Sequence, residues 1–247
     1  MAWRCSGRSN AELISNLFRA QLITSPIVRD AMLAVDRANY APAWYQSEAY
    51  SDTPIPIGYQ ATISAPHMHA QACESLLPLL KQEEGVERRV LDIGRGSGYL
   101  THVLANLVCN TDPNAISSPR RGKVVGVDHI QPLVDQSISN MRKSAEGSHL
   151  LDSGQVELVK ADGRQGYPAA GPYDAIHVGA AAAELHPELI DQLKSPGRMF
   201  IPVEEKGGWG EQYIWVIDKD ADGHVKKEKT MGVRYVPLTN EPADVRR

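Results

Sequence analysis

The stretch Val90-Leu91-Asp92-Ile93-Gly94-Arg95-Gly96-Ser97-Gly98-Tyr99 decides the fold, because an apolar strand in it runs into three alternating glycines and then into a helix. In α/β proteins, a glycine-rich turn between a strand and a helix is where nucleotide-bearing cofactors bind. Tight packing alone also produces such turns. Tyr99 stands where a dinucleotide fingerprint has its third glycine, so the pattern departs from that fingerprint.

Asp92 indicates which cofactor fits this turn. A carboxylate at the end of the strand repels a pyrophosphate and attracts an ammonium group. S-adenosylmethionine carries an ammonium group at its methionine end, whereas a nicotinamide dinucleotide carries a pyrophosphate. The stretch therefore predicts S-adenosyl-L-methionine, with S-adenosyl-L-homocysteine as the product, and leaves a nicotinamide dehydrogenase as a distant alternative.

The chain alternates between strand and helix patterns around this stretch, which predicts a doubly wound, Rossmann-like α/β fold of the S-adenosylmethionine-dependent methyltransferase type. Short apolar runs predict further strands at 123–128, 155–160, 173–182 and 198–203. Helices are expected at 99–108, 132–143 and 187–193, and a polar surface loop at 110–121. Extended segments at 212–218 and 229–238, with a turn at 220–223, predict an antiparallel C-terminal addition.

The whole chain, 1–247, is expected to form a single domain, which its length suits. Residues 1–80 are predicted as a helical prelude with the active-site segment, 81–205 as the cofactor-binding core, and 206–247 as C-terminal strands with a short tail. Helices are expected at 10–20, from Ser25-Pro26 onward and at 67–80, with a surface loop at 40–56. The expected apolar face of the second helix is Ile27, Val28, Ala31, Met32 and Val35.

The composition argues against several classes of protein and site. A formal charge of −4 and a pI near 6.1 argue against a protein that grips nucleic acid through its phosphates. Three widely spaced cysteines, Cys5, Cys73 and Cys109, predict free thiols in a reducing compartment, so we expect a cytoplasmic protein. No run approaches the roughly 20 apolar residues of a membrane span, so no membrane partner is expected, and we expect a monomer. His67 and His69 diverge by about 200° on a helix, so no metal site is expected.

Polar side chains near the ends of strands are further candidates for a cofactor site. Asp128 is expected to accept hydrogen bonds from both ribose hydroxyl groups, although a strand-end Asp also caps the next helix. Asp162 is expected beside the same crevice, as acceptor for the adenine amino group, although an Asp-Gly pair is a common turn. Thr62 and Ser64 lie near the start of the helix at 67–80, which favours an anion, and Ser64 equally suits a capping role.

The chain lacks the motifs of several other enzyme classes: it has no GxSxG elbow, no HExxH and no Walker lysine. Residues 178–181 also lack the Asn/Asp-Pro-Pro-Tyr element of methyltransferases that modify the amino groups of bases. Cofactor-driven group transfer to an acceptor other than an exocyclic base nitrogen remains.

Four stretches resemble the protein-L-isoaspartate (D-aspartate) O-methyltransferase family. They are Ala61-Thr62-Ile63-Ser64-Ala65-Pro66-His67-Met68-His69-Ala70, Asp162-Gly163-Arg164, Tyr173-Asp174-Ala175-Ile176-His177-Val178-Gly179-Ala180-Ala181 and Gly232-Val233-Arg234-Tyr235-Val236-Pro237-Leu238-Thr239. The Ile-Ser-Ala-Pro-His-Met segment is highly specific, whereas the glycine turn is common to many methyltransferases. The likeness extends from the first three residues to Thr239.

The resemblance implies an enzyme that transfers a methyl group from S-adenosylmethionine to the free α-carboxyl group of L-isoaspartyl residues in damaged proteins and peptides. The methyl ester then cyclises to a succinimide, whose hydrolysis returns some normal aspartyl. The implied active-site residue is Ser64. Together with the glycine turn, the expected cofactor-binding residues are Ala61, Thr62, Ile63, Ser64, His69, Asp92, Gly94, Gly96, Ser97, Gly98, Asp128, His129, Asp162, Gly163 and Thr239. The implied substrate-binding residues are Pro66, His67, Val236 and Pro237.

The acceptor chemistry assigns Ser64 a limited role. A carboxylate is already ionised at pH 7, so its attack on the sulfonium methyl needs no general base. In-line alignment and exclusion of water assist the transfer instead. We therefore expect Ser64 to orient the acceptor as a hydrogen-bond donor and not to act as a nucleophile.

Arg95 departs from the family pattern, in which a small residue such as Ser is usual at this place in the glycine turn. The sequence leaves three orientations open: outward to solvent, paired with Asp92 or the cofactor carboxylate, or blocking the site. If the side chain blocks the site, Arg95→Ser should tighten cofactor binding. Two alternatives follow, a catalytically weakened member that acts as an isoaspartyl-peptide binding module and a methyltransferase of the same fold with another acceptor, such as a small molecule or RNA.

Overall fold

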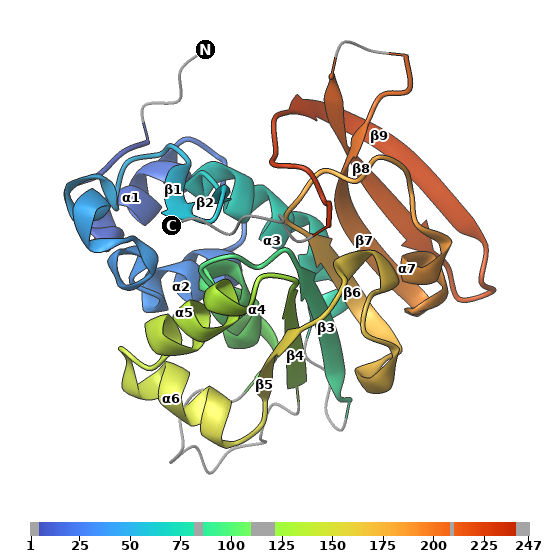
Figure 1. The fold of residues 1–247 in the computed structure, drawn as a ribbon, viewed down its shortest axis with the longest axis horizontal. Coiled ribbons are helices and arrows are strands. Elements are labelled where there is room, and N and C mark those ends of the chain that lie inside the picture. Colours follow the sequence, from blue (N-terminus) through green and yellow to red (C-terminus); the bar gives the residue numbers. More distant parts are fainter. Residues whose placement is uncertain (1–4, 82–85, 110–121, 208–209, 241–247) are drawn as a thin grey trace.

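A seven-stranded sheet forms the centre of the computed structural model, which describes residues 5–81, 86–109, 122–207 and 210–240. The strand order is β5-β4-β3-β6-β7-β8-β9 (Figure 1). Neighbours from β5 to β7 run parallel, and β8 and β9 are antiparallel. This confirms the predicted doubly wound sheet with an antiparallel addition. The strands are β3 (Arg88–Ile93), β4 (Gly122–Asp128), β5 (Val156–Lys160), β6 (Tyr173–Val178), β7 (Leu193–Glu204), β8 (Gln212–Lys219) and β9 (Val225–Val233).

The strand order reverses between β3 and β6, which lie side by side although β4 and β5 separate them in the sequence. In open parallel sheets, ligands bind at the carboxyl ends of the strands where the order reverses. The glycine turn follows β3 directly, so this topology places it at that point.

The helices agree closely with the expected positions. They are α1 (Asn10–Arg19), α2 (Pro26–Ala34), α3 (Pro66–Leu80), α4 (Tyr99–Val108), α5 (Gln131–Met141), α6 (Ala145–Asp152) and α7 (Pro187–Asp191). The sequence reading missed α6, whose N-cap Ser144 accepts a hydrogen bond from the Gly147 N–H group. Ile27 is a correction: it is 53% exposed, because the buried stripe of α2 is centred on Val28 and Met32 and Ile27 lies beyond its edge. The loop expected at 110–121 lies outside the described residues.

The segment expected as a surface loop at 40–56 is more ordered than predicted. It follows the turn η1 (Arg37–Tyr40) and contains η2 (Ala43–Glu48). Tyr40 is buried, since its ring packs edge-on against Tyr99 and its phenol hydrogen bonds with Nδ1 of His102 at 2.5 Å. Aromatic side chains therefore bury part of a segment whose composition is typical of a loop.

A two-stranded antiparallel hairpin, β1 (Ile55–Gly58) and β2 (Ala61–Ile63), lies outside the main sheet. Tyr59 and Gln60 form its turn with φ angles of 54° and 58°. Two consecutive positive φ angles are typical of a tight hairpin turn of type I′. The hairpin leads directly into Ser64 and α3, so its geometry determines where that serine lies.

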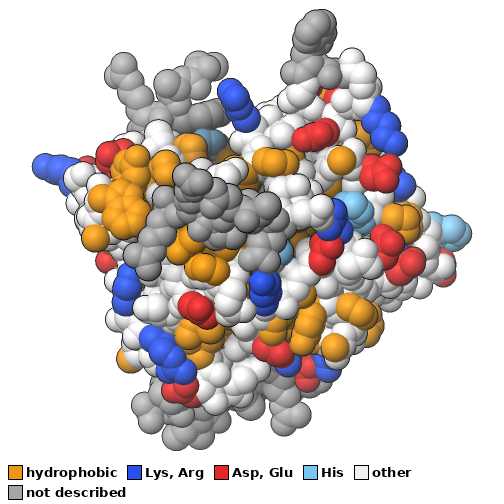
Figure 2. Space-filling view, in the orientation of Figure 1, with side chains coloured by type: hydrophobic (Ala, Val, Ile, Leu, Met, Phe, Trp, Pro, Cys, Tyr) orange, Lys and Arg blue, Asp and Glu red, His pale blue; other side chains and the backbone are white. Residues whose placement is uncertain are grey.

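The central parallel strands β3, β4 and β6 are buried on both faces, as a parallel sheet with helical crossovers requires, whereas the edge strand β9 is exposed. Val90 packs in one apolar cluster with the helices α1 to α4, and its neighbour Leu91 packs in a second cluster with Leu189 of α7. Successive side chains of a strand point to opposite faces, which explains this division. Cys5, Cys73 and Cys109 are buried and form no disulfide, as expected. On the surface drawn in Figure 2, positive and negative side chains are interspersed.

Candidate active site

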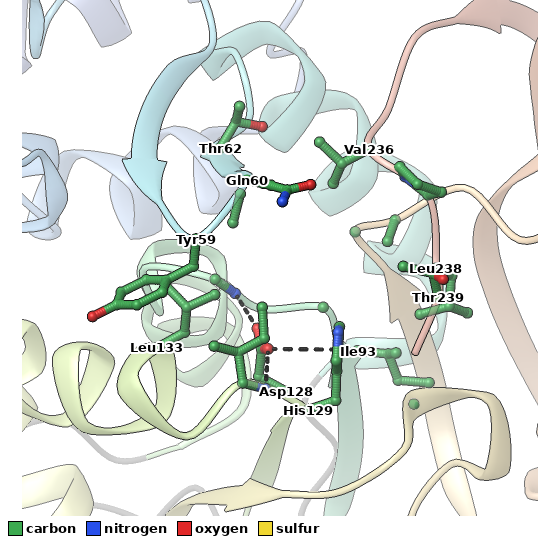
Figure 3. Close-up of a pocket in the computed structure, with 18 of the residues that line it drawn as sticks. Tyr59, Gln60, Thr62, Ile93, Asp128, His129, Leu133, Val236, Leu238 and Thr239 are labelled. Atoms are coloured by element: carbon green, nitrogen blue, oxygen red, sulfur yellow. Dashed lines mark hydrogen bonds and ion pairs between the residues drawn. The ribbon is translucent and has the colours of Figure 1, made fainter. Parts of the chain in front are cut away.

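An outer cavity opens at the carboxyl ends of the parallel strands, with about 730 Å³ of space between its walls, part of it open to solvent. Tyr59, Gln60 and Thr62 of the hairpin form one side, and Val236, Leu238 and Thr239 of the C-terminal segment form another (Figure 3). The strand ends close the third side. Three segments far apart in the sequence therefore surround one space.

The glycine turn leaves no room for side chains at two of its positions. Gly96 has a φ angle of 50°, and a Cβ atom there would lie 3.1 Å from Cδ1 of Ile57 in the hairpin. Gly98 has a φ angle of 85°, and a Cβ atom there would lie 2.9 Å from Cβ of Ser137 in α5. Glycine is therefore required both by backbone conformation and by packing. The turn is held between the hairpin and α5, with its backbone against the cavity.

Asp128 ends β4 and has its carboxylate fixed by two backbone groups. Oδ2 accepts a hydrogen bond from Gly96 N–H and Oδ1 one from Ile130 N–H, both at 3.1 Å. The side chain is 5% exposed and lines the outer cavity (Figure 3). Each carboxylate oxygen has further acceptor capacity, so this fixed group suits two adjacent hydroxyl groups. The N-cap residue of α5 is Ile130, although the bond to Ile130 N–H gives Asp128 part of the capping role that the sequence left open.

Asp92 lies in an adjoining inner cavity with about 310 Å³ of space and is completely buried. Its Oδ2 accepts from Oγ1 of Thr101 at 2.5 Å, and its Oδ1 contacts Nδ1 of His177 at 2.8 Å. Thr101 and His177 were missed by sequence reasoning. The sequence signal for His177 is its place in the strand predicted at 173–182, and the structure pairs it with Asp92 in register between β3 and β6.

His69 also lines the inner cavity, with its ring centroid 5.0 Å from that of Tyr99. Burial, together with the positive charge of Arg37 and the neighbouring His177, holds the pKa of His69 well below its ordinary value. The imidazole is therefore neutral near pH 7. It offers hydrogen bonding to a ligand without adding a positive charge to the cavity.

Ser64 lies between β2 and α3 and lines the inner cavity. The N-cap residue of α3 is Ala65, with no side-chain capping bond, so the capping interpretation of Ser64 is wrong. The carbonyl oxygen of Ser64 accepts a hydrogen bond from Nη2 of Arg37 at 2.9 Å. This backbone anchor leaves the serine hydroxyl available for another role.

The start of α3 is held by Asp52. Its Oδ1 accepts from the backbone N–H of His67 at 3.0 Å and contacts Nδ1 of the same histidine at 2.8 Å. The His67 ring is thereby directed to Asp52, while that of His69 faces Tyr99. The two histidines point to different surroundings, as their spacing implies.

The two cavities bring together most of the predicted site residues. The outer cavity includes Ala61, Thr62, Gly94, Gly96, Asp128, His129, Gly163, Val236, Pro237 and Thr239. The inner cavity includes Thr62, Ile63, Ser64, His69, Asp92, Gly94 and Ser97. Both are lined by Gly179 as well, in the small-residue run after β6. Four predicted residues line neither cavity, and their roles stay predictions: Pro66, His67, Gly98 and Asp162.

Asp162 turns toward Arg164. Its carboxylate accepts hydrogen bonds from the backbone N–H, Nε and Nη2 of Arg164, which lower its pKa from the ordinary value. Gly163, the next residue, lines the outer cavity in its place. The backbone at Asp162 is close to the cavity, while the side chain fixes the turn.

Arg95 does not turn outward to solvent, and it lines the inner cavity but not the outer one. Its side chain is 5% exposed and packs between β4 and α5, where Nη1 donates a hydrogen bond to Oγ of Ser137. The absence of a side chain at Gly126 makes room for it, because a Cβ atom there would collide with Cδ of Arg95. The guanidinium lies beneath the glycine turn and is not among the groups that line the outer cavity.

Residues outside the predicted set also line the cavities. The outer cavity adds Tyr59, Gln60, Ile93, Val127, Ile130, Leu133, Ala180 and Leu238, and the inner cavity adds Arg95, Tyr99, Leu100 and His177. Ile130, the N-cap residue of α5, and Leu133 of α5 carry no distinguishing pattern in the sequence. In the described part of the chain, no helix is long and apolar enough to cross a membrane.

Comparison with known proteins gives a consistent result. A family described as "Protein-L-isoaspartate(D-aspartate) O-methyltransferase (PCMT)" matches residues 8–243. The chain is 47% identical to Protein-L-isoaspartate O-methyltransferase 2 of Arabidopsis thaliana, covering 92% of this chain and 67% of that protein. It is 43% identical to Protein-L-isoaspartate O-methyltransferase of Caenorhabditis elegans, covering 97% and 96%.

A solved structure is similar to this fold over nearly its whole length. It is a crystal structure of a protein-L-isoaspartate O-methyltransferase from Plasmodium falciparum in complex with S-adenosyl-L-homocysteine. The TM-score is 0.79 at 32% sequence identity, and the match covers 94% of this chain and 99% of that one.

Proposed function

The chain belongs to the protein-L-isoaspartate(D-aspartate) O-methyltransferase family, and from this premise we propose that it methylates the free carboxyl group of L-isoaspartyl residues in damaged proteins and peptides. The methyl donor is S-adenosylmethionine, and S-adenosylhomocysteine is released. The ester product cyclises to a succinimide, whose hydrolysis returns part of the material as normal aspartyl residues. The observation that carries the proposal is the junction of the two cavities, which share Thr62, Gly94 and Gly179.

The described residues fit the cofactor. Asp128 presents a fixed carboxylate suited to a pair of ribose hydroxyl groups, and the backbone at Gly163 borders the space expected to hold the adenine. The turn at Gly94 and Gly96 brings backbone close to the ligand, since neither has a side chain. When bound, S-adenosylmethionine supplies a methyl group activated by the sulfonium charge.

The inner cavity is proposed to hold the methionine end of the cofactor near Asp92 and to receive the acceptor carboxylate at Ser64. Ser64 lines this cavity and is proposed to orient the carboxylate by donating a hydrogen bond from its hydroxyl group. His69 stays neutral near pH 7, so it does not place a second positive charge beside the sulfonium. Because the acceptor is already ionised, alignment of the reacting atoms is the main contribution that the protein makes.

The other proposed roles concern contacts with the substrate peptide beside the outer cavity. Val236 and Pro237 border the outer cavity and are proposed, with Pro66 and His67, to contact the peptide on either side of the isoaspartyl residue. Cys5, Cys73 and Cys109 are buried and form no disulfide, which supports the proposal of a reducing, cytoplasmic setting. We propose that the enzyme acts there as a monomer.

A labelled-methyl assay tests the function. The purified protein is incubated with methyl-labelled cofactor and a peptide that contains one isoaspartyl residue, with the matched aspartyl peptide as the control. Base-labile methyl ester should form on the isoaspartyl peptide alone. Equal labelling of both peptides, or of neither, would contradict the proposal.

A further inference from the structure

Arg37 is a buried cation directly behind the wall of the inner cavity. Its side chain is 0% exposed, and its guanidinium carbon lies 5.5 Å from the ring centroid of Tyr99, which lines that cavity. Burying a charged group is costly unless its interactions compensate. Within the described residues, Nε and Nη1 have no hydrogen-bond partner. The remaining nitrogen, Nη2, makes the hydrogen bonds that compensate for the cost of burying the guanidinium.

Those bonds go to backbone carbonyl groups on two segments, one of which contains Ser64. Nη2 donates to the Ser64 carbonyl oxygen at 2.9 Å and contacts that of Thr53 at 3.4 Å. Arg37 belongs to η1, 27 residues before Ser64. It therefore fixes the backbone at the serine from a distant part of the chain.

Tyr235 approaches the same serine from the opposite end of the chain. Its phenol lies near the Ser64 side chain, which opposes the rise that burial gives to the pKa of the phenol. The backbone of Tyr235 is itself fixed by Gln212 of β8, because its N–H donates to Oε1 at 2.6 Å and its carbonyl accepts from Nε2 at 3.2 Å. The backbone that carries the phenol is thus fixed to the antiparallel part of the sheet, beside the serine.

We propose that Arg37 and Tyr235 are positioning residues for methyl transfer, Arg37 acting on the backbone and Tyr235 on the hydroxyl of Ser64. The proposal rests on the proposed function, in which Ser64 orients the acceptor carboxylate. In-line transfer depends steeply on alignment, and a displacement of about 1 Å can cost roughly 100-fold in rate. Two anchors on one residue restrict both its position and the direction of its hydroxyl.

Asn10 provides a matched control. Its buried side chain donates to the carbonyl oxygens of Met32, Leu33 and Val35 at 3.0–3.3 Å. These are side-chain to backbone bonds of the kind that Arg37 makes, but they join α1 to the end of α2 and touch neither cavity. Asn10→Ala therefore reports what the loss of such bonds does to stability alone.

The experiment is a double-mutant cycle on kcat with an isoaspartyl peptide. Tyr235→Phe removes only the hydroxyl group, and Arg37→Lys keeps the charge but loses the planar donor fork. Each should lower kcat by about 10-fold, with cofactor affinity within twofold of the wild type. In a Ser64→Ala background, Tyr235→Phe should have no further effect, because its route of action has been removed. Additive losses in the double variant, or an equal loss of kcat in Asn10→Ala, would overturn the proposal.

Hydrogen–deuterium exchange gives a second measurement that does not need activity. In Arg37→Lys, the amides of 61–68 should exchange faster than in wild type, whereas in Asn10→Ala they should not change. Unchanged exchange there would refute the role of Arg37 even in a fully active enzyme. If the wild type transfers no methyl group, the proposed function fails, while exchange still decides whether Arg37 fastens the serine segment.

Discussion

The carboxyl-end edge of the parallel sheet and the two segments that cross it are built in different ways. These segments are the β1–β2 hairpin and the C-terminal segment around Val236, Leu238 and Thr239. At the edge, backbone hydrogen bonds continue the sheet into the glycine turn, with Gly94 N–H donating to Val127 O at 2.9 Å and Gly179 N–H to Ile93 O at 2.7 Å. The crossing segments attach at few points, such as the isolated bridge between Ala181 and Pro237. The cofactor half of the site is therefore held by many cooperating bonds, and the acceptor half depends on individual side chains.

A buried arginine packs behind each region, Arg95 behind the first and Arg37 of η1 behind the second, and the two differ in surroundings. Arg95, at the sheet edge, lies near the negative charges of Asp128 and Asp92, whereas Arg37 donates to neutral carbonyl groups. Burial lowers the pKa of each guanidinium to about 10. Both remain charged at pH 7. Arg95 contacts Ser137 and lines the inner cavity but not the outer one, so the Arg95→Ser variant distinguishes support of the turn from blocking of the site.

The largest expected effect tests the acceptor half. Ser64→Ala should lower kcat by about 100-fold, the scale of losing one oriented donor, because the acceptor carboxylate is no longer aligned. Cofactor affinity should stay within twofold, since the fixed groups at the sheet edge are untouched. Kinetics with calorimetry of S-adenosylhomocysteine binding would measure both, with Ser148→Ala on α6 as the control. Equal losses in kcat and affinity would remove the distinction between the two regions.

The next effect tests the cofactor half. Asp128→Ala should weaken S-adenosylhomocysteine binding by about 30-fold, because two hydrogen bonds to a charged acceptor are lost. At saturating cofactor, kcat should fall far less. Asp135→Ala is the matched control, because Asp135 lies on the neighbouring α5 and bonds with Gln131 at the surface. A drop in kcat without a change in affinity would reverse the assignment of this region.

A smaller effect is expected from Arg95→Ser. The side chain supports the turn from beneath through Ser137, so its loss should weaken cofactor binding by about fivefold, the scale of one hydrogen bond. This is opposite to the tightening expected if Arg95 blocked the site. Arg95→Met, which keeps most of the packing against Gly126, should recover part of the loss. Tighter calorimetric binding by Arg95→Ser would restore the blocking interpretation.

The smallest effect concerns pH. The pKa of His69 lies well below its ordinary value, so the imidazole stays neutral as the pH rises from 6 to 8. The acceptor carboxylate is ionised throughout that interval. We expect kcat at saturating substrates to vary by less than about twofold across it. A sigmoid centred near pH 6.5 that disappears in His69→Gln would show that this histidine titrates during the reaction.

Much of the fold and part of the site could be predicted from local patterns. Apolar strands followed by turns gave the parallel order, and the carboxyl ends of such strands meet at one edge, which placed Gly94 and Asp128 together. The prediction was weaker for residues whose role depends on a partner. Asp162 was expected to face the ligand, but Arg164 binds its carboxylate, and Ser64 suited a cap that Ala65 occupies.

The sequence by itself determined the alternation of strands and helices, the glycine turn after β3 and the resemblance to a methyltransferase family. These depend on residues close together in the chain, where periodicity and steric limits act directly. Only the tertiary structure decided that Arg95 lies beneath the turn, that His177 pairs with Asp92, and that Arg37 and Tyr235 meet at Ser64. The physical reason is that a long side chain has many rotamers, and packing among distant segments selects one of them.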